Sequence, residues 1–237
     1  MVAEAIAYHP AIAHYLRFVA TTVGRDKVLR TLQYWARFYS WYLFRTNEPE
    51  SAIKPWTTIK SQFGLTRKLL RVGKNVEHFK AAAVAFNAKS DQGKSGILKY
   101  LTIGRQLGYA VYLSFDMVTY LHASGIRKIE SNKKLAMHAA KAWFVGLLCS
   151  VLAGVYSLFT LKQRESAIDR KEGEGVVEAK KIERERATIA TQLISDLCDI
   201  INPATTLGWA NFDDGAIGLA GLVSSLIGLR SAWRKTA

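Results

Sequence analysis

Residues 142–161 read AWFVGLLCSVLAGVYSLFTL and contain twenty consecutive positions without a charged side chain. At a rise of about 1.5 Å per residue, a helix of this length matches the roughly 30 Å hydrocarbon core of a bilayer. Lysines precede the run, and Lys162 and Arg164 follow it, as charges do at a membrane surface. The run therefore predicts a transmembrane helix. The alternative is a helix fully buried in the core of a soluble protein.

A second charge-free run, GAIGLAGLVSSLIGL, occupies residues 215–229. Fifteen residues are short for a full crossing, so this run predicts a tilted or partly re-entrant second membrane segment. Gly218, Gly221 and Gly228 allow a close approach of another helix, and we expect the first span to be that helix. A basic tail, 230–237, follows the run.

The basic residues of the chain are concentrated before the first span. The formal net charge is +14, and residues 1–141 hold 22 basic and 8 acidic side chains, against 11 and 11 in the remainder. Such an excess favours nucleic acid or an acidic membrane as the partner. We expect no nucleic-acid partner, because a soluble nucleic-acid binder would need the first span to be core. The sequence thus predicts an all-α integral membrane protein in which a charged linker and helix, 162–214, separates the two spans.

Residues 61–86 form the most amphipathic stretch of the basic region. At about 100° per residue, apolar side chains fall in one stripe and basic side chains fall on the other side. From Lys60 to Lys80 there are six basic residues and one acid, Glu77. A helix on the surface of a soluble bundle shows the same periodicity, but it normally mixes both signs of charge. The scarcity of acids favours a helix, over about residues 56–88, that lies on acidic lipid.

Two sets of side chains would contact the membrane if this helix docks on it. The basic set, which we expect to meet lipid headgroups, is Arg67, Lys68, Arg71, Lys74 and Lys80. The apolar set, which we expect to insert among acyl chains, is Leu65, Leu69, Val72, Val76 and Phe79. Gly64 and Gly73 weaken the helix in water by about 1 kcal/mol each relative to alanine. We therefore expect the helix to form fully only when it is docked.

Two further predicted helices are aromatic or apolar. Residues 25–45 carry seven aromatic side chains in eleven positions, which predicts either an aromatic bundle core or a helix at a headgroup boundary. Residues 97–126 are largely apolar, but Asp116 and His122 interrupt their second half. A carboxylate at mid-depth costs on the order of 3 kcal/mol, so we expect a buried or half-inserted helix there.

The sequence carries no arrangement typical of an enzyme. The five histidines stand in no metal-ligand spacing, and no nucleophile elbow occurs. Asp196 and Asp199, three residues apart on one helix face, are typical of solvated or capping acids. The Gly-Lys-Ser sequence at 93–95 lacks the earlier glycine and the preceding strand that a phosphate-binding loop needs. We therefore expect no catalytic residue, no metal and no cofactor.

Residues 22–45, TVGRDKVLRTLQYWARFYSWYLFR, resemble the peroxin-eleven family of membrane proteins that proliferate peroxisomes. The resemblance rests on Gly24-Arg25-Asp26-Lys27, followed by Arg30 and by Gln33-Tyr34. The order of the parts, from the aromatic N-terminal region to the glycine-rich C-terminal run, also resembles the fungal members over nearly the whole length. The resemblance implies a protein integral to the peroxisomal membrane that binds anionic lipid through its amphipathic helix and elongates the organelle before fission.

The resemblance also implies self-association and help in recruiting the dynamin-type fission machinery. A helix that lies in one leaflet expands the headgroup region of that leaflet and favours positive curvature, which explains elongation physically. The alternative function is a channel for small metabolites across the same membrane, a role also proposed within the family. Asp116 and His122 would then line its path, because ionisable groups within a membrane often mark a pathway.

Overall fold

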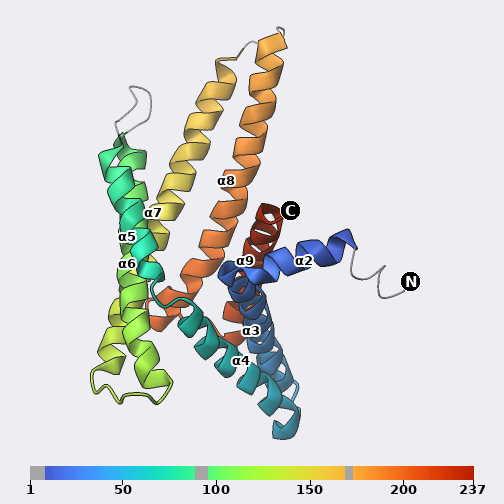
Figure 1. Ribbon diagram of the computed structural model, residues 1–237, viewed down its shortest axis with the longest axis vertical. Helices are drawn as coiled ribbons and strands as arrows, with labels where there is room; N and C mark the ends of the chain where they lie inside the picture. Colours follow the sequence, from blue (N-terminus) through green and yellow to red (C-terminus); the bar gives the residue numbers. More distant parts are fainter. Residues whose placement is uncertain (1–8, 89–95, 169–172) are drawn as a thin grey trace. The chain divides into compact units, whose positions relative to one another are not determined.

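The structure, a computed structural model, describes residues 9–88, 96–168 and 173–237 (Figure 1). Every regular element in these ranges is an α-helix, which confirms the predicted all-α class. The helices form two compact units: one comprises the chain up to residue 71 together with residues 211–237, and the other comprises residues 72–210. The Gly-Lys-Ser sequence at 93–95 lies outside the described residues.

The helices of the first unit are α2 (Pro10–Ala20), α3 (Thr22–Arg45), α4 (Glu50–Leu70) and α9 (Asp214–Lys235). Side chains before α3 and α9 cap their first turns: the Thr21 hydroxyl accepts the Gly24 N–H at 2.9 Å, and the Asp213 carboxylate accepts the Ala216 N–H at 2.8 Å. Such caps satisfy backbone donors that have no partner within the helix. Helices α3 and α9 therefore begin where the sequence supplies a side-chain oxygen acceptor.

The glycines of α9 let the aromatic face of α3 pack closely against it. A Cβ atom on Gly221 would lie 2.1 Å from the Tyr34 ring, and one on Gly218 would lie 2.7 Å from the Phe38 backbone. Only glycine fits at such distances. The structure therefore corrects our prediction that these glycines face the first span, because their close neighbour is α3. The Tyr34 side of α3 is the aromatic core that the sequence offered as one of two alternatives.

The helices of the second unit are α5 (Lys74–Asn87), α6 (Gly96–Ala123), α7 (Asn132–Ser166) and α8 (Gly173–Thr206). Each helix packs against the next one along the chain. Gly108 of α6 and Gly146 of α7 bring these two backbones together, and the rings of Tyr112 and Trp143 stack with centroids 5.1 Å apart. Small residues at a helix contact are common between membrane helices.

Two described helices, α7 and α9, are long and apolar enough to cross a membrane. They contain the two charge-free runs that the sequence singled out. In α7, only 22% of the most apolar window is buried inside the protein. A core helix of a soluble protein would bury most of that surface, so the exposure agrees with lipid contact.

Three local predictions were wrong. The amphipathic stretch is two helices, because Arg71–Gly73 form a turn and Gly73 adopts a left-handed conformation with φ of 82°. The Asn-Pro sequence at 202–203 predicts the end of a helix, but α8 continues through Pro203 to Thr206. Asp196 and Asp199 are buried, with exposed fractions of 3% and 8%, whereas we expected solvated acids.

Candidate membrane-binding surface

Helix α4 presents a polar face to solvent and packs its other face on α3. Its exposed side chains include Lys54, Thr58, Ser61 and Gln62. On the inner side, the Trp56 ring meets the Tyr39 ring edge to face at 4.8 Å. Helix α4 therefore has the arrangement of an ordinary bundle helix in water.

Arg67, the first of the predicted lipid-binding cations, lies inside this contact. Its side chain is 9% exposed, and its Nε donates to the Asp26 carboxylate at 2.9 Å. A second guanidinium nitrogen donates to the Gln33 side-chain oxygen at 2.6 Å. Arg67 thus joins α4 to α3, and a lipid headgroup has no access to it in this arrangement.

The charges around Asp26 keep this buried pair ionised. Burial alone would raise the pKa of the Asp26 carboxyl, but the guanidinium groups of Arg67 and Arg71 outweigh that effect and hold the pKa below its usual value. Burial lowers the pKa of Arg67, and the negative charge of Asp26 opposes that shift. Arginine stays protonated at neutral pH, so the contact is an ion pair.

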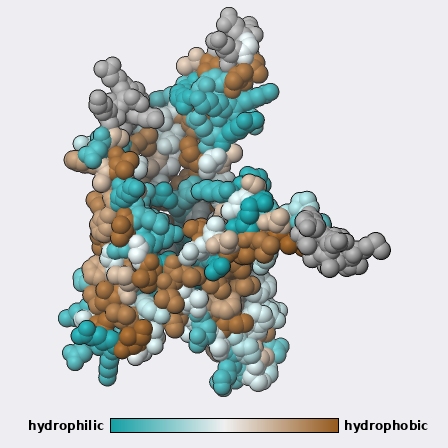
Figure 2. Space-filling view, in the orientation of Figure 1, coloured by the Kyte–Doolittle hydropathy of each residue, from teal (hydrophilic) through white to brown (hydrophobic). Residues whose placement is uncertain are grey.

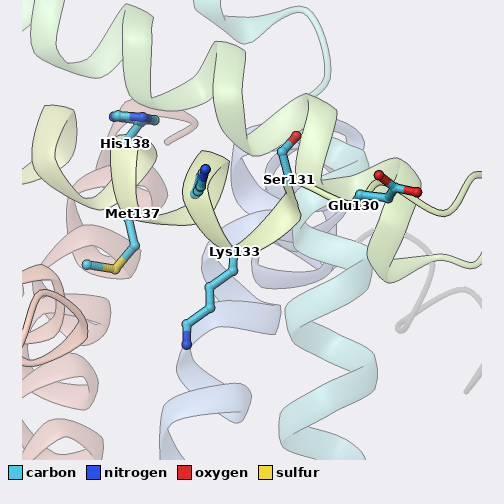
Figure 3. Close-up of a pocket in the computed structure, with 6 residues that line it drawn as sticks. Glu130, Ser131, Lys133, Met137 and His138 are labelled. Atoms are coloured by element: carbon cyan, nitrogen blue, oxygen red, sulfur yellow. The ribbon is translucent and has the colours of Figure 1, made fainter.

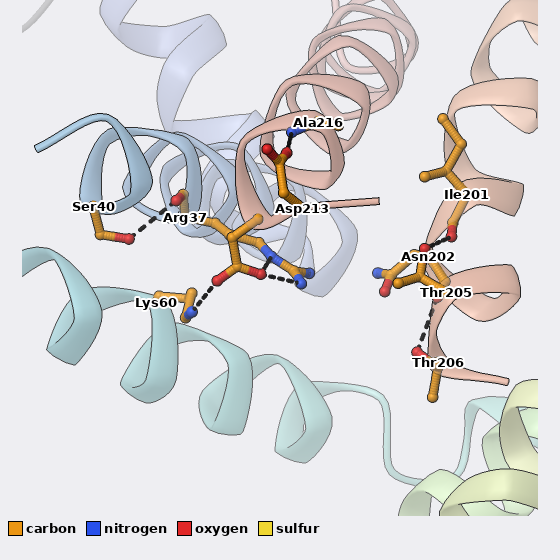
Figure 4. Close-up of polar contacts among 10 residues, drawn as sticks. Arg37, Ser40, Lys60, Ile201, Asn202, Thr205, Thr206, Asp213 and Ala216 are labelled. Atoms are coloured by element: carbon orange, nitrogen blue, oxygen red, sulfur yellow. Dashed lines mark hydrogen bonds and ion pairs between the residues drawn. The ribbon is translucent and has the colours of Figure 1, made fainter. Parts of the chain in front are cut away.

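A second ion-pair group joins three helices of the same unit (Figure 4). The Asp214 carboxylate at the start of α9 accepts from Arg37 of α3 at 2.7 Å and from Lys60 of α4 at 2.9 Å. Asp214 is 42% exposed on its side chain, so solvent screens these pairs and each contributes little to stability. Their geometry nevertheless joins the start of α9 to the middle of α3 and of α4.

Helix α5 is arranged in the opposite way to α4. Its polar side chains face α6: the Asn75 amide donates to the Ser114 hydroxyl at 3.0 Å, and the His78 ring lies 2.7 Å from the Gln106 side-chain oxygen. Its large apolar side chains are exposed and recur at helical spacing, and Glu77 and Lys80 are exposed beside them. The apolar side chains are Val76, Phe79, Val84 and Phe86, with exposed fractions of 64%, 45%, 62% and 67%. We call this set, together with the exposed Val72 before it, the α5 apolar face.

The remaining predicted lipid-binding residues differ in exposure. Lys80 is exposed on α5, whereas Lys68, Arg71 and Lys74 are half-buried. Among the predicted inserting residues, Leu69 and Val72 are about half exposed, and Leu65 is half-buried. The apolar set therefore lies closer to the surface than the basic set does.

The two residues of the channel alternative lie near one end of α6. Asp116 is buried at 6% exposure. The His122 ring accepts the Ile129 N–H at 3.0 Å, so it holds the turn between α6 and α7. The structure does not bring these two side chains together, and the channel stays a prediction.

An open hollow that the sequence did not indicate lies at the start of α7 (Figure 3). Its volume is about 640 Å³, and its lining includes Lys133, Lys134 and His138. These residues precede the charge-free run by about one to two and a half helical turns, near the level where a spanning helix meets lipid headgroups. Two lysines at that level suit an anionic headgroup. Clustering of lysines just before a span is the sequence signal that could have indicated it.

Comparison with known proteins identifies a matching family and several full-length relatives. A family model described as "Peroxisomal biogenesis factor 11 (PEX11)" matches residues 12–233. Peroxisomal membrane protein PMP30B of Candida boidinii is 26% identical, with 100% of this chain and 99% of that protein covered. Peroxisomal membrane protein PMP27 of Saccharomyces cerevisiae is 25% identical, with 100% of both covered. Peroxisomal biogenesis factor 11 of Schizosaccharomyces pombe is 24% identical, with 95% and 96% covered. No solved structure matches the chain.

Proposed function

Because this chain belongs to the PEX11 family of peroxisomal biogenesis factors, we propose that its α5 apolar face inserts into acidic membrane and elongates the peroxisome before fission. The chain is a peroxisomal membrane protein with a role in peroxisome proliferation, as its full-length relatives indicate. We assign it no catalytic step. Self-association and help to the dynamin-type fission machinery remain part of the proposal, since they rest on the family resemblance.

One observation carries the proposal: the α5 apolar face points outward while Asn75 and His78 of α5 point toward α6. Exposed apolar surface in water costs about 25 cal/mol for each Å² that could have been buried. Transfer of the Val76, Phe79 and Phe86 side chains from water into an apolar phase is therefore favourable. A bilayer supplies that phase, and the nearby Lys80 supplies attraction to acidic headgroups.

The mechanism requires α5 to leave α6 and lie along one leaflet, because α6 holds α5 beside the charge-free run of α7 in the fold described above. An amphipathic helix places its apolar face about 5 to 10 Å into the boundary between headgroups and acyl chains. Because only one leaflet takes up this volume, that leaflet expands relative to the other and the membrane bends away from it. Many copies along one membrane would stabilise a tubule, which is the elongated form that precedes fission.

The test uses the full chain reconstituted into vesicles of neutral or acidic lipid and examined by electron microscopy. We expect tubules with acidic lipid, and we expect Val76→Ser with Phe79→Ser to abolish them while the protein stays in the membrane. Thr58→Ser is the matched control, because it changes an exposed residue on the polar face of α4. Tubules of equal number from the double variant would overturn the proposal.

A further inference from the structure

Helices α7 and α8 lie side by side and run in opposite directions. The Ser150 hydroxyl of α7 donates to the Asp196 carboxylate of α8 at 2.6 Å. Four residues further along α7, a Cβ atom on Gly154 would contact Leu193, which lies three residues earlier in α8. This register sets residues 187–206 of α8 alongside the charge-free run 142–161 of α7.

We propose that residues 187–206 cross the bilayer beside α7, so that α7 and α8 form a membrane hairpin. The inference rests on α7 being a span. Twenty helical residues cover about 30 Å, which is the thickness of the hydrocarbon core. Hydropathy does not single out α8, because Asp196, Asp199 and several threonines and amides lie in this stretch.

Asp196, Gln192 and the threonines of this stretch have hydrogen-bond partners within the protein. Asp196 is 3% exposed and accepts from Ser150 and from the Gln192 amide, the latter at 2.8 Å. The threonine hydroxyls donate to backbone carbonyls four residues earlier, and Figure 4 shows two of these bonds. The four threonines are Thr188, Thr191, Thr205 and Thr206. Polar groups are tolerated in the interior of a membrane when they form hydrogen bonds within the protein.

The outer surface of the hairpin is suited to acyl chains. On α8, Ile194 and Leu197 are 51% and 49% exposed. On α7, large apolar side chains are exposed at spacings of three and four residues, and they are Val145, Leu148, Leu152, Val155 and Phe159. The acids Asp196 and Asp199 are thus buried. The large apolar groups face outward, together with the exposed Thr188, Thr191 and Gln192.

Apart from Asp196 and Asp199, the charged residues of the hairpin begin where the proposed crossing ends. Arg186 pairs with Glu165, and Arg164 pairs with Glu178 and Glu185. Figure 2 shows hydrophilic atoms gathered at this end of α7 and α8. These ion pairs lie directly beyond residues 161 and 187, where a 30 Å crossing would reach water. The turn directly before α7 and the residues directly after α8 then lie on the same side of the membrane.

The test measures how oxygen and a water-soluble nickel chelate reach nitroxide labels on the full chain in vesicles. Cysteines replace Leu197 or Ile194 on α8, after Cys149→Ala and Cys198→Ala remove the native thiols. Leu152→Cys on α7 is the lipid reference, and Glu183→Cys on the charged half of α8 is the water reference. We expect oxygen to be favoured several-fold over nickel at both α8 sites, as at Leu152.

Each other outcome counts against the hairpin in a different way. Nickel access at the α8 sites equal to that at Glu183, with Leu152 still in lipid, overturns the hairpin and leaves the α7 span standing. Low access of both reagents at Leu197 and Ile194 means that a protein surface, such as a second copy, covers α8. Nickel access at Leu152 itself shows that α7 is no span, and the hairpin then fails with its premise. Tubulation by the α5 apolar face is measured separately.

Discussion

Helices α4 and α5 derive from one amphipathic pattern, yet they bury opposite faces. Helix α4 packs apolar residues on α3 and exposes Lys54 and Gln62, whereas α5 packs Asn75 and His78 on α6 and exposes Val76. The pattern is nearly the same in both helices, but the neighbouring helix differs. The aromatic α3 offers an apolar partner surface, whereas α6 offers Ser114 and Gln106. Periodicity therefore identifies two faces, and the neighbour decides which of them is buried.

The largest expected effect comes from removing the Arg67–Asp26 ion pair, which holds α4 on α3. Breaking a buried pair by deleting one partner costs about 3–5 kcal/mol. We expect Arg67→Ala to lower the free energy of unfolding of the first unit by that amount, measured by pulse proteolysis of the full chain in detergent. Lys54→Ala, an exposed lysine on the same helix, is the control and should change little.

A double variant separates lost charge from lost packing in that test. Asp26→Leu with Arg67→Met replaces both charges by apolar side chains, and such replacements are often neutral or stabilising. Recovery of stability in the double variant would assign the loss to the unpaired Asp26. If Arg67→Ala melts like the unchanged protein, Arg67 is not buried as described.

Lowering the pH should weaken the contact between Arg67 and Asp26, because protonation removes the negative charge of the Asp26 carboxylate. Because the pKa of Asp26 is lower in the folded protein than in the unfolded chain, its contribution to stability is complete above the unfolded pKa, about 3.9. It is lost as the pH falls through the still lower folded value. We expect unfolding titrations below about pH 4 to show this loss, and Asp26→Asn to remove this step. Equal acid sensitivity in Asp26→Asn would assign the loss to other carboxylates.

The sequence predicted the two apolar spans and α3 well, because charge-free runs and aromatic periodicity are local signals. It missed the break at Gly73, because the stripe continues from Val72 to Val76 and hides the turn between them. It also gave no sign that Arg67 and Asp196 are buried. Their partners Asp26 and Ser150 lie 41 and 46 residues away, and periodicity carries no information at that separation. Ionisable residues that close a helix contact look like solvated ones until the contact is known.

The smallest expected effect concerns Lys80, the exposed lysine of α5. Lys80→Gln should weaken contact between α5 and acidic lipid by about 1 kcal/mol, which is roughly a fivefold change in equilibrium. An environment-sensitive fluorophore on Ala83→Cys, in the cysteine-free chain, reports the fraction of α5 in contact with lipid. The difference should disappear near 1 M salt, where the Debye length falls to about 3 Å. Lys54→Gln removes the same charge from the water-facing side of α4. If it weakened lipid contact as much as Lys80→Gln does, net charge and not the exposed face of α5 would govern the contact.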